Sequence, residues 1–502
     1  MFRHPTALLI AMLLQNTIAF SQDKIFSYPI ADKAELIQGK NVYNKAFFSL
    51  SQNDSLLIFS EKSDRNFEKV YSTNIKDSNN KTFRELSKKT KKLSSLLTDT
   101  SLLTTLYFKD NYYHKYQIYF VSMNTNSGNI YIQDTINIER DEELVTSYTT
   151  DSCFYILSCF RKTNQLILYT KKIGQPSFYR SYEIDNLKFG KQYSKWPLSL
   201  NTKIKNLYQQ LDKPYMIVEP NVEYPLSLMM VKNKFYFNQN LLTITIDNEE
   251  LKTLIIQLPL SDTSFSVKEI SNKVDAVKFK INKSVSNSFL LDSTLIQTNI
   301  SRGVFHLTYH NINTGAELKT YRLDANDSIS FTSPIVQKGN FFSSKKESEI
   351  SLRRMLYTLT DNVVAFGITV TKKDSLYNIA IGGQYTRVDA TRLVLGSTLF
   401  FATPVNPFGP SLTEGFWIAV RSFATALVND YDAGNMIRFS VTTDFDYKLS
   451  DKLYTPSLKR ISDFMKEKEH HKNSPVFYYP STFLKYLGFR LEKENEFSIF
   501  AF

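Results

Sequence analysis

The chain has 502 residues and a net charge of +12, from 61 Lys and Arg against 49 Asp and Glu. This length exceeds the usual ceiling for one compact core, so the sequence predicts either several domains or a repeat architecture. The positive charge favours anionic partners without selecting one, and it equally suits a basic surface that keeps the protein soluble.

The first 21 residues, 1–21, have the three parts of a secretory signal peptide. Arg3 is the charged start, residues 7–14 are apolar, and the small residue Ser21 precedes a cleavage point before Gln22. The apolar run is too short to span a bilayer core of about 30 Å as a helix, and no later segment approaches ~20 uninterrupted apolar residues. We therefore expect an exported chain, in the periplasm, at the cell surface or in the medium, without a transmembrane helix in the mature protein.

Short strands rich in Val, Ile, Thr, Tyr and Phe follow, and a hairpin-like pattern recurs among them. Residues 54–60 and 151–158 both begin with Asp-Ser, and in each copy the final Ser precedes a Tyr by eleven residues. Weaker copies, the best of them at 292–309, continue at intervals of roughly fifty residues, which is the size of one propeller blade. The sequence thus predicts an all-β fold, a β-propeller of about six to seven four-stranded blades over residues 22–450.

Two other architectures fit many short strands. The first is a pair of tandem β-sandwich domains, because accidental alternation can imitate a blade repeat. The second is an outer-membrane β-barrel, which the alternating strands and the final Phe502 bring into consideration. Long charged loops and two predicted helices count against the barrel.

Both cysteines, Cys153 and Cys159, fall on one predicted strand over residues 153–160. Six residues of strand separate them by about 20 Å, well beyond the roughly 7 Å between Cα atoms that a disulfide allows. Their shared parity places both on one face, as small buried apolar groups.

A helical insertion interrupts the repeat over about 191–225. Apolar residues at helical spacing over 204–211 predict a short helix that ends before Pro214. An insertion over one face of a ring can form a binding surface, and Trp196 and Tyr208 are its candidate contact residues. The alternative is a capping helix whose apolar face fills the core.

The segment 451–502 contains a second predicted helix and a return to strand. An apolar stripe over residues 458–465 indicates the helix, and residues 497–502 form the strand. Because the last strand of a circular fold often completes the first blade, we expect this tail to pair beside residues 24–50.

No metal or catalytic motif stands out. His306 and His310 would meet on a helix, but in a strand they lie about 13 Å apart, which argues against a shared metal. Asp444 and Asp446 point to one face of a predicted strand. The loop 430–435 lacks the acidic spacing of a helix-loop-helix calcium site, so a plain hairpin turn is favoured.

The sequence therefore favours an exported, non-enzymatic β-propeller that binds or scaffolds an envelope protein or a glycan, with no cofactor, no metal and no nucleic acid. The candidate contact residues are aromatic: Trp196, Tyr208, Phe408 and Trp417. The basic clusters at 88–92 and 345–354 are expected to be solvated loops. The alternative is a carbohydrate-active hydrolase or lyase whose carboxylates come from separate blades and converge within about 5–10 Å.

Overall fold

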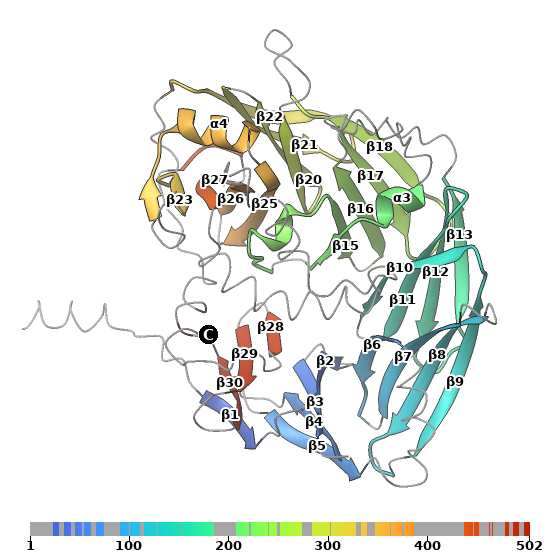
Figure 1. The fold of residues 1–502 in the computed structure, drawn as a ribbon. Helices are drawn as coiled ribbons and strands as arrows, with labels where there is room; N and C mark the ends of the chain where they lie inside the picture. Colours follow the sequence, from blue (N-terminus) through green and yellow to red (C-terminus); the bar gives the residue numbers. More distant parts are fainter. Residues whose placement is uncertain are drawn as a thin grey trace, which may run out of the picture.

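The computed structural model describes most of residues 24–385 and 436–501. Apart from short gaps, the segments left undescribed within these limits and between them are 75–90, 185–206, 274–283, 386–435, 451–460 and 465–476. Figure 1 shows the described strands as sheets arranged around a ring, which is a β-propeller and confirms the predicted all-β class. No described helix has the length and apolar character needed to span a bilayer.

The described strands form six hydrogen-bonded sheets. The eight-stranded sheet contains two four-stranded meanders, joined where Lys40 and Asn41 pair in parallel with Leu96 and Leu97. We name these meanders blades 1 and 2. Counted separately, they bring the ring to seven blade-sized units, within the predicted range of six to seven.

Blades 1 to 3 are consecutive antiparallel meanders. Blade 1 consists of β2 (Glu35–Asn41), β3 (Ala46–Gln52), β4 (Ser55–Glu61) and β5 (Phe67–Asn74). Blade 2 consists of β6 (Lys91–Leu97), β7 (Ser101–Asp110), β8 (Lys115–Asn124) and β9 (Ile130–Ile138). Blade 3 consists of β10 (Glu142–Thr149), β11 (Cys153–Phe160), β12 (Gln165–Lys172) and β13 (Phe178–Glu183).

The next blades are less uniform, because blades 4 and 6 have five strands each. Blade 4 consists of β14 (Tyr215–Val218), β15 (Asn233–Asn238), β16 (Leu241–Asp247), β17 (Lys252–Pro259) and β18 (Ser266–Ser271). Blade 5 consists of β19 (Val285–Leu291), β20 (Thr294–Ser301), β21 (Val304–Asn311) and β22 (Glu317–Asp324). Blade 6 consists of β23 (Val336–Lys338), β24 (Glu347–Glu349), β25 (Val363–Lys373), β26 (Leu376–Tyr385) and β27 (Met436–Asp444).

A closing blade joins the two ends of the described chain. Its strands are β28 (Phe477–Pro480), β29 (Lys485–Arg490), β30 (Glu496–Ala501) and β1 (Lys24–Pro29). β1 pairs antiparallel with β30, and Lys24 forms an ion pair with Glu496 at 3.3 Å. The tail therefore pairs beside the start of the chain, as its sequence predicted.

The recurring hairpins correspond to real strand pairs, but not all of them are equivalent. The pairs β11–β12 and β20–β21 are the second and third strands of their blades, whereas β4–β5 are the third and fourth strands of blade 1. The Asp-Ser pairs lie just before or at the start of the first strand of each hairpin, and Asp292 there adopts a φ of 52°. The repeat thus marks a turn chemistry as well as a blade period.

Alternate residues of one strand face different neighbouring blades. On β11, Phe154 and Ile156 belong to an apolar cluster shared with blade 2, whereas Leu157 and Cys159 belong to one shared with blade 4. Cys153 also packs against this second cluster, and both cysteines are free. The prediction that they share one strand and one face is confirmed, and burial, followed by the nearby Glu142, raises the pKa of Cys159 to about 12.

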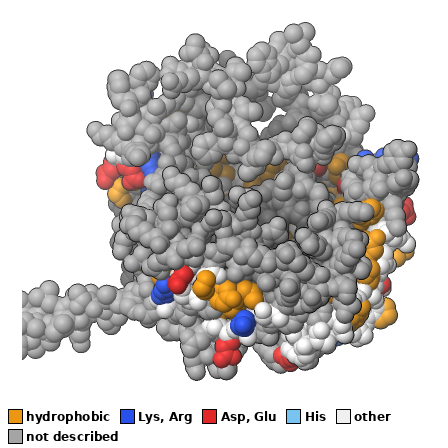
Figure 2. All heavy atoms as spheres, turned by 60° about the horizontal axis from the view of Figure 1, so that its bottom comes forward, with side chains coloured by type: hydrophobic (Ala, Val, Ile, Leu, Met, Phe, Trp, Pro, Cys, Tyr) orange, Lys and Arg blue, Asp and Glu red, His pale blue; other side chains and the backbone are white. Residues whose placement is uncertain are grey.

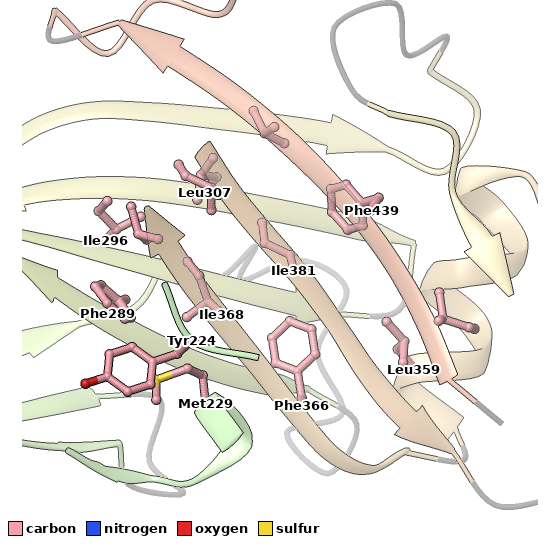
Figure 3. Close-up of a cluster of buried hydrophobic side chains, with 14 of the residues drawn as sticks. Tyr224, Met229, Phe289, Ile296, Leu307, Leu359, Phe366, Ile368, Ile381 and Phe439 are labelled. Carbon is pink, nitrogen blue, oxygen red and sulfur yellow. The ribbon is translucent and has the colours of Figure 1, made fainter. Parts of the chain in front are cut away.

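The largest apolar cluster lies between blades 5 and 6 and extends to Leu487 and Phe500 of the closing blade; Figure 3 shows part of it. Helix α4 (Leu352–Asp361) covers it with Leu352, Met355, Leu356 and Leu359, which lie at helical spacing. The 3-10 helix η2 (Leu228–Met230) packs so closely on β25 that a Cβ on Gly367 would lie 2.8 Å from Met230. Helix α4 also places Arg353 and Arg354 on its exposed side, so the prediction of a loop there is wrong.

A buried polar network joins blades 4 and 5. The ammonium of Lys234 lies 3.8 Å from a carboxylate oxygen of Asp247 and donates to Asn287 Oδ1 at 2.6 Å. Asp247 also accepts from the backbone N–H of Ser288 at 2.9 Å and from the hydroxyl of Thr253 at 2.7 Å. Because every one of these groups is buried, the bonds orient the two blades relative to each other.

Candidate binding surface

Large apolar side chains are exposed on the outermost strand of blade 2. β9 pairs with β8 and, among the described residues, with no other strand. Tyr131 and Ile132 on this strand are 50% and 46% exposed. Adjacent large apolar residues on an outer strand are unusual, because such edges are normally protected by charge.

The outermost strand of blade 3 has the same character. Phe178 and Tyr179 at the start of β13 are 42% and 66% exposed. The guanidinium of Arg180 lies 4.6 Å from the ring centre of Phe178, and the ring of Tyr179 lies 5.9 Å from that of Tyr169. These contacts hold the two exposed rings in place without covering them.

Hydrogen bonds connect the two strands. Asp134 on β9 accepts from the backbone N–H of Ser177 at 2.8 Å and from the ammonium of Lys171 at 3.3 Å. Partial burial acts to raise the pKa of Asp134, but the hydrogen bonds from Ser177 and Lys171 outweigh it and hold the pKa below its usual value. At ~3.3 Å per residue, the exposed side chains of both strands begin within about 10 Å of Asp134 or Ser177.

The surface continues onto blade 4. Arg180 donates to the backbone carbonyl of Ser261 at 3.0 Å, and the hydroxyl of Tyr182 donates to that of Asp262 at 3.2 Å. Phe265, which is 39% exposed, packs edge-on against Tyr182. We call the exposed side chains of these three blades the rim patch; they are Tyr131, Ile132, Phe178, Tyr179 and Phe265. In Figure 2, exposed hydrophobic side chains follow the right-hand edge of the molecule, the side on which β9 lies in Figure 1.

The outer strands of blades 4 and 5 are different. β18 carries Glu269, which pairs with Lys252 at 3.3 Å. β22 carries Glu317, which pairs with Lys273 at 2.8 Å, and an exposed Lys319. Leu318 is the large apolar side chain exposed on β22, at 41%. Charge protects these edges, so the aromatic edges of blades 2 and 3 are a local feature and not a property of the whole ring.

Of the contact residues expected from the sequence, Trp196, Phe408 and Trp417 lie outside the described residues. Tyr208 lies on helix α3 (Leu207–Leu211), half-buried against the cluster between blades 3 and 4. Burial, followed by the nearby Asp212, raises its pKa to about 12. The side chain of Leu207 is fully buried and its N–H donates to Asn164 Oδ1 at 2.8 Å, which is the behaviour of the alternative capping helix.

Charged groups surround Tyr208. Glu143 on β10 forms an ion pair with Arg161, and both lie near Tyr208 and Asp212. Desolvation, supported by the Glu143 carboxylate, raises the pKa of Asp212 against the opposing effects of Tyr208 and Arg161. These groups satisfy one another, so they attach α3 to blade 3.

Two buried carboxylates among the described residues are also engaged. Glu142 on β10 is buried and accepts hydrogen bonds from the hydroxyls of Ser158 and Tyr169. Burial raises the pKa of Glu142, and these two hydroxyls act in the opposite direction. Together with the buried Asp247, Glu142 stabilises contacts between strands.

The remaining candidate groups do not converge. His306 and His310 are buried on strand β21, and burial lowers the pKa of His310 although Glu317 opposes it. β27 ends at Asp444 and Asp446 lies in a turn, so the prediction that both point from one strand face is wrong. The loop 430–435 lies outside the described residues. Within the described ranges, no group of three His, Cys, Asp or Glu is placed to hold a metal ion.

The geometry defines the class of protein as a β-propeller, and comparison with known proteins adds nothing more specific. No family model and no curated protein matches the chain. Among solved structures it is similar to the WD40 domain of SCAP from fission yeast, at 9% identity over 71% of this chain and 74% of that chain, with a TM-score of 0.25. It is also similar to the Nup133 β-propeller domain of Vanderwaltozyma polyspora, at 9% identity over 59% and 74%, with a TM-score of 0.23.

A prolyl endopeptidase gives a third similarity, at 10% identity over 74% of this chain and 52% of that chain, with a TM-score of 0.29. At these identities and TM-scores, these similarities indicate no function for this chain.

Proposed function

We propose that this chain is an exported β-propeller that acts by binding, as a scaffold or adaptor for an envelope protein or a glycan, and not by catalysis. The observation that carries the proposal is the rim patch. Its aromatic side chains supply a large contact area at a low cost in conformational entropy. Aromatic side chains and Arg are also the residues that contribute most at protein interfaces.

The rim patch suits binding because its geometry is fixed before a partner arrives. Phe178 lies against Arg180, Phe265 lies against Tyr182, and the hydrogen bonds of Asp134 join β9 to β13. A surface that needs little ordering keeps more of its contact energy as affinity.

Export is supported by the position of the closing strand. β1 begins at Lys24, shortly after the expected cleavage point before Gln22, so cleavage would leave its pairing with β30 intact. Mass spectrometry of the exported protein tests this directly. We expect a mature chain that begins at Gln22, and an uncleaved chain that remains in the cytoplasm would contradict export.

The enzyme alternative requires carboxylates from different blades to converge at the mouth of the channel. In the described ranges, the carboxylates Glu142 and Asp247 come from different blades, and each is buried and hydrogen-bonded within its own surroundings. They give this alternative no support.

A pull-down from an envelope extract tests the binding function. The purified mature chain is compared with a variant that carries Tyr131→Ser, Phe178→Ser and Tyr179→Ser, at low and at high salt. The matched control is Leu318→Ser with Lys319→Ser, which alters the outer strand of blade 5. We expect the rim variant to lose the retained partner and the control to keep it, with a protein partner surviving high salt. Equal retention by all three proteins would exclude the rim patch as the binding surface.

A further inference from the structure

The backbone of β13 offers an unpaired edge. β13 pairs with β12 from Gln165–Glu183 to Thr170–Phe178 without a shift in register, and within the described chain its other edge pairs with nothing. An unpaired strand edge is a template for an additional strand from another chain. On β13 this edge coincides with the most exposed aromatic side chain of the rim patch, Tyr179.

The outer strands of blades 2, 4 and 5 are less suited to pair with an added strand. The pairing of β8 with β9 shifts between Phe120 and Val121, and such irregularities twist a strand and interrupt further pairing. β18 and β22 carry the charged side chains described above. β13 is thus the outer strand among these that combines regular pairing with exposed aromatic side chains.

The charges beside β13 indicate the chemistry of the added strand. Arg180 lies in the middle of β13, Lys172 is exposed at the end of β12, and the acidic Glu183 lies at the far end of β13. Side chains directly opposite each other on paired strands have Cβ atoms about 4.5–5.5 Å apart, and opposite charges there are favourable. The complement of Arg180 is therefore a carboxylate.

We propose that β13 binds an extended segment of a partner protein as an added β-strand, with an acidic side chain opposite Arg180 and apolar side chains beside Phe178 and Tyr179. This inference rests on the proposed binding function and names its partner as a peptide strand; a glycan is an alternative outcome of the test. Backbone hydrogen bonds would supply affinity, and the rim patch and Arg180 would supply specificity.

Selection from a display library of random peptides on the immobilised mature chain tests this proposal. We expect enrichment of sequences with one acidic residue between apolar residues, and no enrichment on the Phe178→Ser, Tyr179→Ser variant. The best enriched peptide is then synthesised in three forms: unmodified, with Asn in place of its acidic residue, and with every backbone amide methylated. Methylation leaves the side chains in place but removes the donors that strand pairing requires.

Fluorescence polarisation measures the affinities of the three peptides. We expect methylation to weaken binding at least tenfold, because a peptide without backbone N–H donors cannot form the hydrogen bonds that pair it with the edge of β13. The change from acid to Asn should weaken binding by up to about fivefold on the native chain and leave it unchanged on Arg180→Gln, since an opposed charge pair contributes up to about that factor. Arg180→Gln keeps a side-chain donor for the carbonyl of Ser261, and its thermal midpoint confirms that it folds.

Three results would overturn the inference: equal binding of the methylated peptide, an equal effect of Asn on both proteins, or no enrichment. If one of these occurs while the pull-down still depends on the rim patch, the strand addition is wrong and the binding function remains. A glycan retained through the rim patch belongs to this case. If the rim variant also retains the same partner as the native chain in the pull-down, both proposals fail.

Discussion

The two faces of blade 4 are built from alternate residues of the same strands, yet their chemistry differs. Toward blade 3, β15, β16 and β17 contribute Phe235, Ile244 and Ile256 to an apolar cluster. Toward blade 5, the same strands contribute Lys234, Asp247 and Thr253 to the polar network. Both faces are buried.

This difference shows that polar alternation in a ring does not indicate solvent. A strand with one apolar and one polar face usually packs on the core with the first and faces water with the second. In blade 4 the polar residues meet another blade. Apolar burial attaches blade 4 to blade 3, whereas against blade 5 a smaller apolar cluster that includes Ile255 and Leu295 is combined with the hydrogen bonds that orient the two blades. The two interfaces should therefore respond differently to substitution.

The largest effect is expected from Lys234→Met, which leaves the Asp247 carboxylate buried without its cation. Breaking a buried ion pair costs about 3–5 kcal/mol, and urea unfolding measures the loss. The control is Lys234→Met combined with Asp247→Leu, which removes both charges and should recover most of the stability. A single variant as stable as the native chain would show that the network contributes no orientation energy.

The apolar interface should lose stability by a different mechanism. Ile244→Ala removes side-chain volume between blades 3 and 4, and we expect a loss of about 2–5 kcal/mol from burial and cavity terms. Removing a second side chain should not restore stability here, because the loss comes from missing volume and not from an unpaired charge. Recovery of stability in the pair Ile244→Ala with Leu168→Ala would contradict this distinction.

Thr253→Val is a milder substitution that compares the stability contributions of the two faces of blade 4. Its hydroxyl donates to Asp247 Oδ1 and accepts from Gln297 Nε2 at 2.9 Å, so the nearly isosteric Val removes one buried hydrogen bond from each of these two groups. The expected loss is about 1–3 kcal/mol. Ile256→Val on the opposite face is the matched control, at about 0.5–1.5 kcal/mol. A smaller loss for Thr253→Val than for its control would argue against the network.

The last comparison concerns pH. Burial, opposed by Asp247 and reinforced by Lys232, lowers the pKa of Lys234 to about 8. The unfolded chain binds a proton at this lysine up to about pH 10.4, whereas the folded chain has released it above about 8. The free energy of unfolding should therefore gain a contribution that rises with pH through this window. Chemical denaturation at pH 8 and pH 10 should show the rise in the native chain and in Ile244→Ala, but not in Lys234→Met.

Strand periodicity and turn chemistry were sufficient to predict the ring, its approximate blade number and its closing strand. Helical periodicity should also have revealed α4, because its apolar residues Leu352, Met355, Leu356 and Leu359 follow a helical spacing. The adjacent Arg353 and Arg354 instead suggested a solvated loop. The partner of each polar face could not be read from the sequence, because it depends on which blade lies next to it.

The rim patch was missed for a related reason. In an all-β chain with many aromatic residues, Phe178 and Tyr179 look like core, and their exposure follows from the position of β13 as the last strand of its blade. The signal that could have identified them is a pair of adjacent large apolar residues at the start of the last strand of a four-strand repeat. Such a pair must place one side chain on each face of an outer strand.

The pairing of β1 with β30 also has a consequence for the order of events during synthesis. Lys24 and Glu496 are 472 residues apart in the chain, so β1 leaves the ribosome long before its partner exists. The intervening blades can form local hairpins during that time, because their strands are neighbours in sequence. The circle itself is completed only by the last strand, and a chain that stops before β30 is an open arc whose first strand has no neighbour on that side.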